Sequence, residues 1–390
     1  MEFADTAEWK SAGERKKMSR ILIINPILYT SETNRIPKVK TIKDTMIYTF
    51  CLGFLNLGHQ VTLLAARDYR PETEEEYDFP ILFMRTAGHK LFQPRCFPYM
   101  PELRTFLKRH REYDLILSSE VFGTWSYTAS RVCPEKTVIW HELAKHNNIL
   151  HQLPSKIWYH IIARCMMRRT PVVPRSEAAS AFIGRFLPRV ADFCVDHGVN
   201  LRKFPEMDKV KKQNYFVVVS QFIERKKIDR TIMRFRDFLE KGHDGYRLYL
   251  IGQGELESAY RDLIVRCHLE EKIVICGQMG HERLLPFVSE ARAMLVSTVK
   301  DNNMVSIVES IAAGTPVVTT SVPYNAAYIR GEELGIVADE WGVEELEKIC
   351  DENDKYVRNC IRYREKLSNT YLANRFMEYA KAVLEIESGI

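Results

Sequence analysis

Two carboxylates separated by seven residues, Asp301 and Glu309, bracket a loop-to-helix turn in the second half of the chain. The stretch 293–320 predicts a strand, a polar loop, a short helix beginning near Met304, a Gly314 cap and another strand. Free amides at a helix start favour a phosphate or an anionic sugar. Carboxylates beside a nucleotide would instead accept hydrogen bonds from sugar hydroxyls, because they repel phosphate. On spacing alone, a helix with an acidic first turn and a solvated Glu309 explains the pattern equally well.

The same stretch resembles a known signature. The Asp301-x7-Glu309 spacing, followed by Ser-Ile-Ala-Ala-Gly-Thr-Pro-Val-Val, resembles the Glu-x7-Glu pattern of the retaining glycosyltransferases of family 4, which have the GT-B fold. The resemblance implies that Asp301 approaches the donor sugar and that Glu309 binds the ribose. It also implies that loop amides hold the sugar ring and the phosphates, here at Asn302, Asn303, Met304 and Val305. The chain departs from the pattern because its first carboxylate is Asp and its loop lacks the usual glycines.

Three further segments resemble the same family in the same order along the chain. The segment 216–227 resembles the strand and loop in which an Arg and a Lys clamp the donor diphosphate. Lys226 matches the lysine, the arginine position is Gln221, and Arg225 adds a charge. The implied donor contacts also include Gly252 of a Gly-x-Gly turn, with Gly277, Gln278 and Met279 near the nucleotide base. Taken singly, these residues are also explained as a solvated loop lysine and ordinary strand-end turns.

The first half of the chain offers fewer candidates. His141 follows a predicted buried strand, and the resemblance implies that it faces the cleft near the transferred sugar, with Glu142 in a family Asp position. A lone histidine after a strand is more often a structural residue. Asn25, Thr30 and Arg35 in the loop after the first strand are candidate acceptor-side residues. Family members usually have glycines in that loop, and this chain has none.

Short apolar runs that alternate with amphipathic ones must position these residues, and they predict two parallel sheets with helices on both faces. We expect an α/β chain of two doubly wound, Rossmann-like domains facing across a cleft. The expected parts are an extension at 1–18, an acceptor-side domain at 19–204, a linker at 205–214, a nucleotide-sugar domain at 215–368 and a C-terminal helix at 369–390. The last helix must bury its apolar stripe on one of the two domains. The expected strands are 20–24, 60–65, 81–84, 115–118, 137–140 and 170–173, then 215–220, 247–251, 272–276, 293–297 and 316–320.

Composition narrows the class of protein. The chain has 390 residues, 46% of them hydrophobic and 27% charged, which is typical of a globular protein of two domains. No run approaches the ~18 apolar residues that a membrane-spanning helix needs, and the charged start lacks the features of a signal peptide. Nine cysteines without a Cys-x-x-Cys pair favour reduced thiols in the cytoplasm. Nucleic acid is rejected as a partner, because no recognised binding module occurs.

The basic residues are concentrated in the first half. Residues 1–200 contain 28 Lys and Arg against 21 Asp and Glu, a balance of +7, whereas the remainder carries −2. Within an expected helix at 155–169, Lys156, His160, Arg164 and Arg168 recur every four residues and share one face. Such a stripe suits the inner face of an anionic membrane, which the protein would contact peripherally. A helix packed on its domain with a solvated charged edge is the competing interpretation.

The resemblance implies a retaining, metal-independent glycosyltransferase that needs no cofactor. Its substrate would be a nucleotide-diphosphate sugar of the UDP or GDP type, and its acceptor a glycan or a lipid-linked molecule. The setting would be cell-surface polysaccharide or glycolipid synthesis. The alternative is a catalytically inactive nucleotide-sugar-binding scaffold of a glycosyltransferase complex, which the departures at Gln221 and Asp301 motivate. An epimerase of the same architecture is a third option that fits the loops less well.

Overall fold

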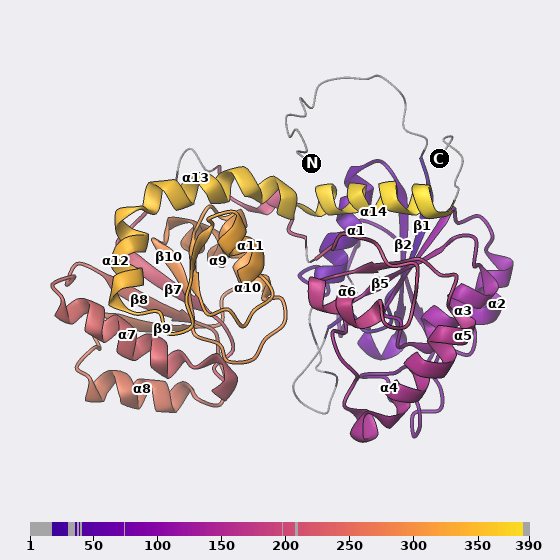
Figure 1. The fold of residues 1–390 in the computed structure, drawn as a ribbon, viewed down its shortest axis with the longest axis horizontal. Coiled ribbons are helices and arrows are strands. Elements are labelled where there is room, and N and C mark those ends of the chain that lie inside the picture. The colour runs from indigo at the N-terminus through magenta and orange to yellow at the C-terminus, as the bar shows by residue number, and fades with distance from the viewer. Residues whose placement is uncertain are drawn as a thin grey trace, which may run out of the picture.

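The structure is a computed structural model that describes residues 18–29, 36, 39, 41–73, 75–196, 198–206 and 210–384. Two sheets of six parallel strands lie side by side, each with helices on its faces (Figure 1). The first sheet has the order β3-β2-β1-β4-β5-β6 and defines the first domain. Its strands are β1 (Arg20–Ile24), β2 (Gln60–Ala66), β3 (Ile81–Met84), β4 (Leu115–Ser119), β5 (Thr137–His141) and β6 (Val172–Pro174).

The second sheet repeats this topology in the order β12-β11-β10-β7-β8-β9 and defines the second domain. Its strands are β7 (Tyr215–Val219), β8 (Arg247–Ile251), β9 (Ile273–Gly277), β10 (Ala293–Val296), β11 (Val317–Thr319) and β12 (Gly335–Val337). In both sheets the strand order reverses direction between the first and fourth strands. Ligands of doubly wound sheets bind beyond the carboxyl ends of the strands at this switch point. The switch points therefore lie between β1 and β4, and between β7 and β10.

Helices cover both sheets. The first domain has α1 (Met46–Asn56), α2 (Leu103–Arg109), α3 (Thr124–Val132), α4 (Leu153–Ile157), α5 (Arg164–Met166) and α6 (Glu177–Ile183), with the shorter segments η1 (Arg67–Tyr69), η2 (Ile149–Gln152), η3 (Trp158–Ala163) and η4 (Leu201–Lys203). The rest of the chain has α7 (Ile228–Glu240), α8 (Glu257–Arg266), α9 (His281–Glu290), α10 (Val305–Ala312), α11 (Ala326–Gly331), α12 (Val343–Asp351), α13 (Asn353–Tyr363) and α14 (Asn369–Leu384), with η6 (Glu224–Lys226) and η7 (Arg364–Leu367).

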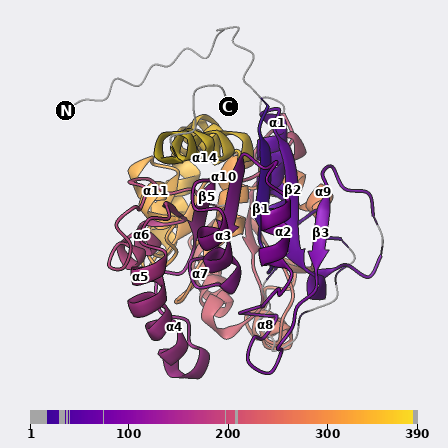
Figure 2. The same cartoon turned by 90° about the vertical axis from the view of Figure 1, so that its right-hand side faces the viewer.

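The last helix, α14, crosses from the second domain and lies on the first. Its apolar face, including Phe376, joins the core that α1 builds against the first sheet. Phe376 makes edge contacts with Phe50 and Phe54 of α1, with ring centroids 6.2 and 6.3 Å away. Gly53 allows this approach, because a Cβ there would lie 2.2 Å from the carbonyl oxygen of Asn369. Figures 1 and 2 show α14 at one end of the first domain and α4 at the opposite end.

Several element boundaries differ from the sequence predictions. The first helix begins at Met46 after the N-cap Thr45, whose hydroxyl accepts a hydrogen bond from the amide of Tyr48. The sixth strand is shifted to Val172–Pro174, and the strand Gly335–Val337 was not predicted. The expected helix at 155–169 is a helical run from 153 to 166, so Arg168 lies in the turn beyond it.

Candidate functional site

An ion-pair cluster joins the loops after β7 and β10 at the switch point of the second domain. The ammonium of Lys226 is bound to a carboxylate oxygen of Asp301, and Arg225 Nη1 lies 3.0 Å from that same oxygen. The Thr298 hydroxyl donates to it as well, at 3.2 Å. The three charged side chains are mostly shielded, with exposed fractions of 10% for Lys226, 12% for Asp301 and 29% for Arg225. Two cations therefore share one carboxylate, and the cluster carries a local charge of +1.

The backbone around the cluster is held tightly. A small pocket beside it is lined by Ser220 of the β7 loop, Lys226, Thr298 and Met304, among others. Gly252, after β8, has a φ of 144° and packs on the same loop, because a Cβ there would lie 1.8 Å from the carbonyl oxygen of Ser220. Gly252 is thus required for packing at this site. The cluster is a preorganised electropositive position of the kind that binds a diphosphate.

The loop 302–304 contacts the first domain. The side-chain amide of Asn303 donates to the carbonyl of Arg175 at 3.3 Å. The amide of Met304, expected to be free for a ligand, donates instead to the side-chain oxygen of Asn325 at 2.6 Å. Asn302 and Val305 are exposed. The helix begins at Val305, close to the predicted start near Met304, but the amide of its N-cap residue Met304 is already bound by the buried Asn325.

Glu309 lies on α10, and a histidine connects it to the first domain. Its Oε1 lies 3.0 Å from Nε2 of His281, the first residue of α9, and the Glu309 side chain is 15% exposed. The opposite ring nitrogen of His281 lies 3.4 Å from Oδ1 of Asp44, which precedes α1. Glu309 is therefore not a solvated helix residue. It is held at the boundary between the domains.

The remaining donor-side candidates are spread along the ends of β7 and β9. Gln221 and Gln278 are exposed, and Met279 packs partly against the core beneath α10. Gly277 adopts a φ of 68°, and its carbonyl accepts a hydrogen bond from the amide of Gly252 at 2.9 Å. These residues lie at the carboxyl ends of the strands of the second sheet, as the cluster of Lys226 and Asp301 does.

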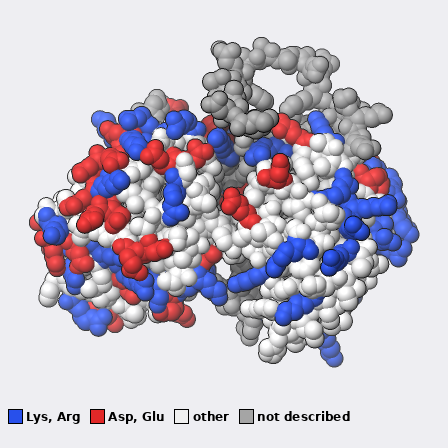
Figure 3. Space-filling view, viewed as in Figure 1, with Lys and Arg blue, Asp and Glu red and all other residues white. Residues whose placement is uncertain are grey.

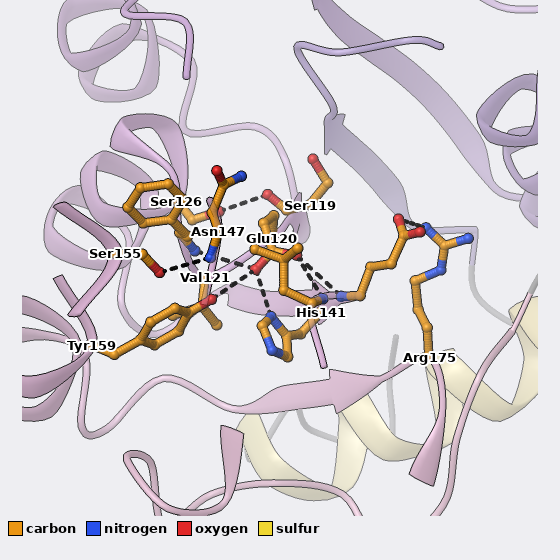
Figure 4. A network of polar contacts seen from close by, with 12 residues as sticks. Ser119, Glu120, Val121, Ser126, His141, Asn147, Ser155, Tyr159 and Arg175 are labelled. Atoms are coloured by element: carbon orange, nitrogen blue, oxygen red, sulfur yellow. Dashed lines mark hydrogen bonds and ion pairs between the residues drawn. The ribbon is translucent and has the colours of Figure 1, made fainter. Parts of the chain in front are cut away.

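His141 differs from its expected position. The strand continues one residue further than predicted, so His141 is the last residue of β5, and its side chain is fully buried. Its Nδ1 lies 2.6 Å from Oε1 of Glu120 (Figure 4). Its ring lies near that of Phe182, with the centroids 6.2 Å apart. The prediction that His141 faces the cleft was wrong, because strand alternation turns the ring into the core.

Glu120 is the centre of this network in the first domain. Its carboxylate accepts hydrogen bonds from the amides of Phe122, Glu142 and Leu143 and from the hydroxyl of Tyr159. Burial alone would raise the pKa of Glu120, but the contact with His141 and the amides lower it to about 2. The backbone of Glu120 has a φ of 66°, which is strained for a residue other than glycine. Such strain at the end of β4, at the switch point, is typical of functional positions.

Arg175 follows β6, and its side chain contacts residues of the first domain. Its Nη1 lies 2.5 Å from Oε2 of Glu142, and its guanidinium lies 4.5 Å from the ring centroid of Trp140. Figure 4 shows Arg175 at the edge of the network that contains Glu120 and His141. Because its carbonyl also binds Asn303, this residue links the first-domain network to the donor-side loop.

The acceptor-side candidates are only partly described. The Asn25 side chain is half-buried after β1 and donates to the carbonyl of Ile27 at 2.9 Å. Thr30 and Arg35 lie outside the described residues. In the part of the chain that the structure covers, no group of three or more His, Cys, Asp or Glu side chains is arranged to hold a metal ion.

Four residues of the site were not identified from the sequence: Glu120, Arg175, His281 and Asn325. Glu120 and Arg175 each have a local signal, a charged residue that directly follows a buried strand. The others act through partners far away in the sequence. The sequence candidates Lys226 and Asp301 are brought together, Glu309 lies on the following helix, and His141 belongs to a separate network in the first domain.

Residues 200–366 match the family model described as Glycosyl transferases group 1. The second domain is thus similar in sequence to the domains of that family. A solved structure with the same fold over most of the chain is that of Anabaena Alr3699/HepE in complex with UDP-glucose. It has a TM-score of 0.61 and 12% identity, and the match covers 93% of this chain and 100% of that one. The two-sheet architecture is the GT-B fold.

Two curated relatives are similar at the sequence level. The O-antigen chain mannosyltransferase RfbU of Salmonella typhimurium is 20% identical over 170 residues, which is 42% of this chain and 47% of that protein. The alpha-monoglucosyldiacylglycerol synthase of Streptococcus pneumoniae is 18% identical over 319 residues, 75% of this chain and 70% of that protein. The match with the mannosyltransferase thus spans about half of that protein's length.

Proposed function

We propose that the protein is a glycosyltransferase that transfers a sugar, with retention of anomeric configuration, from a nucleotide-diphosphate sugar to a glycan or lipid-linked acceptor. The observation that supports this most is the cluster of Arg225, Lys226 and Asp301. It lies at the switch point of the domain that matches the group 1 family, where a diphosphate would be expected.

The chemistry follows from the charges. The bond between the sugar C1 and the diphosphate oxygen breaks, and negative charge develops on the leaving diphosphate. Lys226 and Arg225 stabilise this charge in a largely shielded position, which makes the interaction stronger than it would be in water. The acceptor oxygen forms the new bond to C1 on the same face of the sugar, and its proton passes to the leaving diphosphate. This route needs neither a metal ion nor a strong general base.

The donor and acceptor classes are supported by the relatives. A protein with this fold binds UDP-glucose, which favours a donor of the UDP type, with GDP as the alternative. The relatives act in O-antigen and glycolipid formation by their names, which favours a role in cell-surface polysaccharide or glycolipid synthesis. The proposal places the protein in the cytoplasm, at the inner face of the membrane.

The test is a panel of nucleotide sugars measured by thermal shift, followed by transfer assays with glycan and glycolipid acceptors. A specific donor should raise the unfolding temperature in proportion to its concentration over Kd. The anomeric configuration of the product, read by NMR, separates retention from inversion, and a chelator tests metal independence. Tight donor binding without transfer to any acceptor would favour the inactive scaffold instead.

A surface on the first domain supports a membrane-borne acceptor. Four aliphatic side chains on η2, α4 and η3 are strongly exposed: Leu150 at 72%, Leu153 at 60%, Ile157 at 47% and Ile161 at 57%. Beside them Lys156, His160, Arg164 and Arg168 are also exposed. The helix is anchored in its domain by Trp158 and Tyr159, so the exposed residues form a fixed amphipathic face.

Among the described residues, no carboxylate lies within ion-pair distance of Lys156, Arg164 or Arg168. No helix in the described ranges is long and apolar enough to span a membrane. Exposed aliphatic side chains flanked by unpaired cations fit an interface with anionic lipid headgroups. Packing through Trp158 agrees both with a helix that has a solvated charged edge and with a helix that contacts a membrane. The row of exposed aliphatic side chains favours membrane contact.

Flotation with vesicles of phosphatidylcholine, with and without ~30% anionic lipid, tests this surface. We expect binding only to anionic vesicles, weakening as salt rises. Ile161→Glu should abolish it, whereas Val265→Glu should not, because Val265 of the second domain is a matched aliphatic residue with 55% exposure against 57%. Equal loss in both variants, or binding that salt does not change, would contradict the proposal.

A further inference from the structure

One histidine connects the two domains through two carboxylates. The Nε2 atom of His281 lies 3.0 Å from Oε1 of Glu309, within the second domain. Its Nδ1 atom lies 3.4 Å from Oδ1 of Asp44, in the first domain. Asp44 also lies 3.4 Å from the ammonium of Lys203, in the segment that crosses between the domains. The ring is 30% exposed and sits at the boundary where Asn303 meets Arg175.

The contacts require a charged ring. A neutral imidazole has one N–H and can donate to only one carboxylate, whereas the protonated ring donates from both nitrogens. Hydrogen bonds to Asp44 and Glu309 raise the pKa of His281 to about 10, and the contact with His281 lowers the pKa of Asp44 to about 2. The ionisable groups that face the ring are these two carboxylates, with Lys203 facing Asp44. The bridge is therefore fully formed at neutral pH.

We propose that His281 is a positioning residue for donor binding, which orients Glu309 for the ribose and couples this orientation to domain contact through Asp44. The inference rests on the proposed function, because it takes Glu309 as the ribose-binding carboxylate. A carboxylate accepts several hydrogen bonds, so His281 can hold one oxygen while ribose hydroxyls bind. The contact between His281 and Asp44 forms only when the two domains meet. Contact between the domains and the orientation of Glu309 therefore stabilise each other.

Two substitutions separate the halves of the bridge. His281→Gln keeps a single amide donor group and cannot bridge two carboxylates as an imidazolium does. We expect it to weaken nucleotide-sugar binding about ten-fold by calorimetry at pH 7. Asp44→Asn leaves the Glu309 contact in place and should weaken binding roughly three- to ten-fold, although Asp44 belongs to the other domain.

The matched control is His243→Gln. His243 lies in the second domain, 3.0 Å from a Glu347 carboxylate oxygen, and is 31% exposed, so its pair resembles that of His281 and Glu309 except for the domain boundary. Binding in this variant should equal that of the unmodified protein. If His281→Gln binds donor as tightly as His243→Gln does, the positioning role is refuted.

A pH profile distinguishes positioning from a general structural effect. In the unmodified protein, His281 should remain protonated up to about pH 9, so its titration should not change donor affinity below that pH. In Asp44→Asn the ring loses one carboxylate, so its pKa falls and donor affinity should decline at a lower pH. Parallel profiles in the two proteins would overturn the coupling.

NMR titration of the His281 ring makes the bridge testable without any donor. We expect the ring to remain protonated through pH 9 and to titrate lower in Asp44→Asn. A ring that titrates near its ordinary value of about 6.5 would overturn the bridge itself. If the ring behaves as expected but no nucleotide sugar binds the unmodified protein, the proposed function fails and the positioning role fails with it, while the bridge stands.

Discussion

Within the cluster of Lys226 and Asp301, replacing the carboxylate should strengthen nucleotide binding, whereas replacing the lysine should weaken it. Asp301→Asn replaces a carboxylate by a neutral group of the same shape, and Thr298 can still contact it. Arg225 and Lys226 then lose the anion they share, so the local charge rises from +1 to +2. We therefore expect free UDP or GDP to bind more tightly to Asp301→Asn, although sugar transfer falls because Asp301 is proposed to approach the donor sugar.

The magnitude follows from distance and shielding. The interaction between two unit charges ~4 Å apart is about 1 kcal/mol in water and about 4 kcal/mol at an effective dielectric constant of 20. The exposed fractions of 10% for Lys226 and 12% for Asp301 place the cluster between these limits. Removing the repulsion between Asp301 and the diphosphate should tighten binding at least about five-fold. Lys226→Met loses a hydrogen bond to a charged group, worth ~1.5–3 kcal/mol, and should weaken binding about ten- to hundred-fold.

Calorimetry with UDP and GDP at low and moderate salt measures both changes, with circular dichroism to confirm the fold. Asp262→Asn is the control, because it removes one negative charge from the exposed face of α8 and changes the net charge equally. Its nucleotide affinity should be unchanged. If Asp301→Asn weakens nucleotide binding as Lys226→Met does, the cluster is not the diphosphate site and the reasoning from shared charge is wrong.

Three other changes test the site and its scaffold. Glu309→Ala should lower transfer at least about ten-fold with the fold intact, because a charged acceptor for the ribose is lost; normal turnover in a donor assay would contradict the assignment. Phe376→Ala, which empties a fully buried position between α14 and α1, should cost roughly 3–5 kcal/mol of unfolding free energy in urea. Glu120→Gln should flatten the acid dependence of stability. Because folding lowers the pKa of Glu120 to about 2, its contribution to folding stability is present above about pH 4.5 and is lost as the pH falls through 2. If the urea midpoints of both proteins change in parallel between pH 6 and 3, this result would argue against the buried pair with His141.

Local patterns predicted much of the fold and part of the site. Apolar runs marked eleven of the twelve strands within the described residues, since buried parallel strands are continuous in hydrophobicity. The strand Gly335–Val337 was missed because it is three half-buried residues at the edge of its sheet. Lys226 and Asp301, two candidates from local motifs, meet because their loops follow the neighbouring strands β7 and β10; their roles remain a proposal.

The remaining site contacts depend on tertiary structure. His281 and Asp44 are 237 positions apart, and Asn303 and Arg175 are 128 apart, so no spacing indicates that they meet. His141 illustrates a finer limit. It continues the alternation of β5, so its ring lies on the same face as Ile139, where Phe182 covers it and Glu120 is its partner.

The uneven charge of the chain corresponds to two uses of basic residues. On the second domain cations and carboxylates intermingle, as Figure 3 shows on the left, and Arg234 pairs with Glu340 as Lys355 does with Glu333. On the first domain Lys156 and Arg164 have no carboxylate within ion-pair distance among the described residues, and they flank exposed aliphatic side chains. Paired surface cations contribute little to binding at a distance, whereas unpaired ones keep their attraction for an anionic surface. Under the proposed function, the excess of positive charge favours the first domain as the side that would meet a membrane-borne acceptor. The second domain holds Arg225 and Lys226 against Asp301 at the proposed donor site.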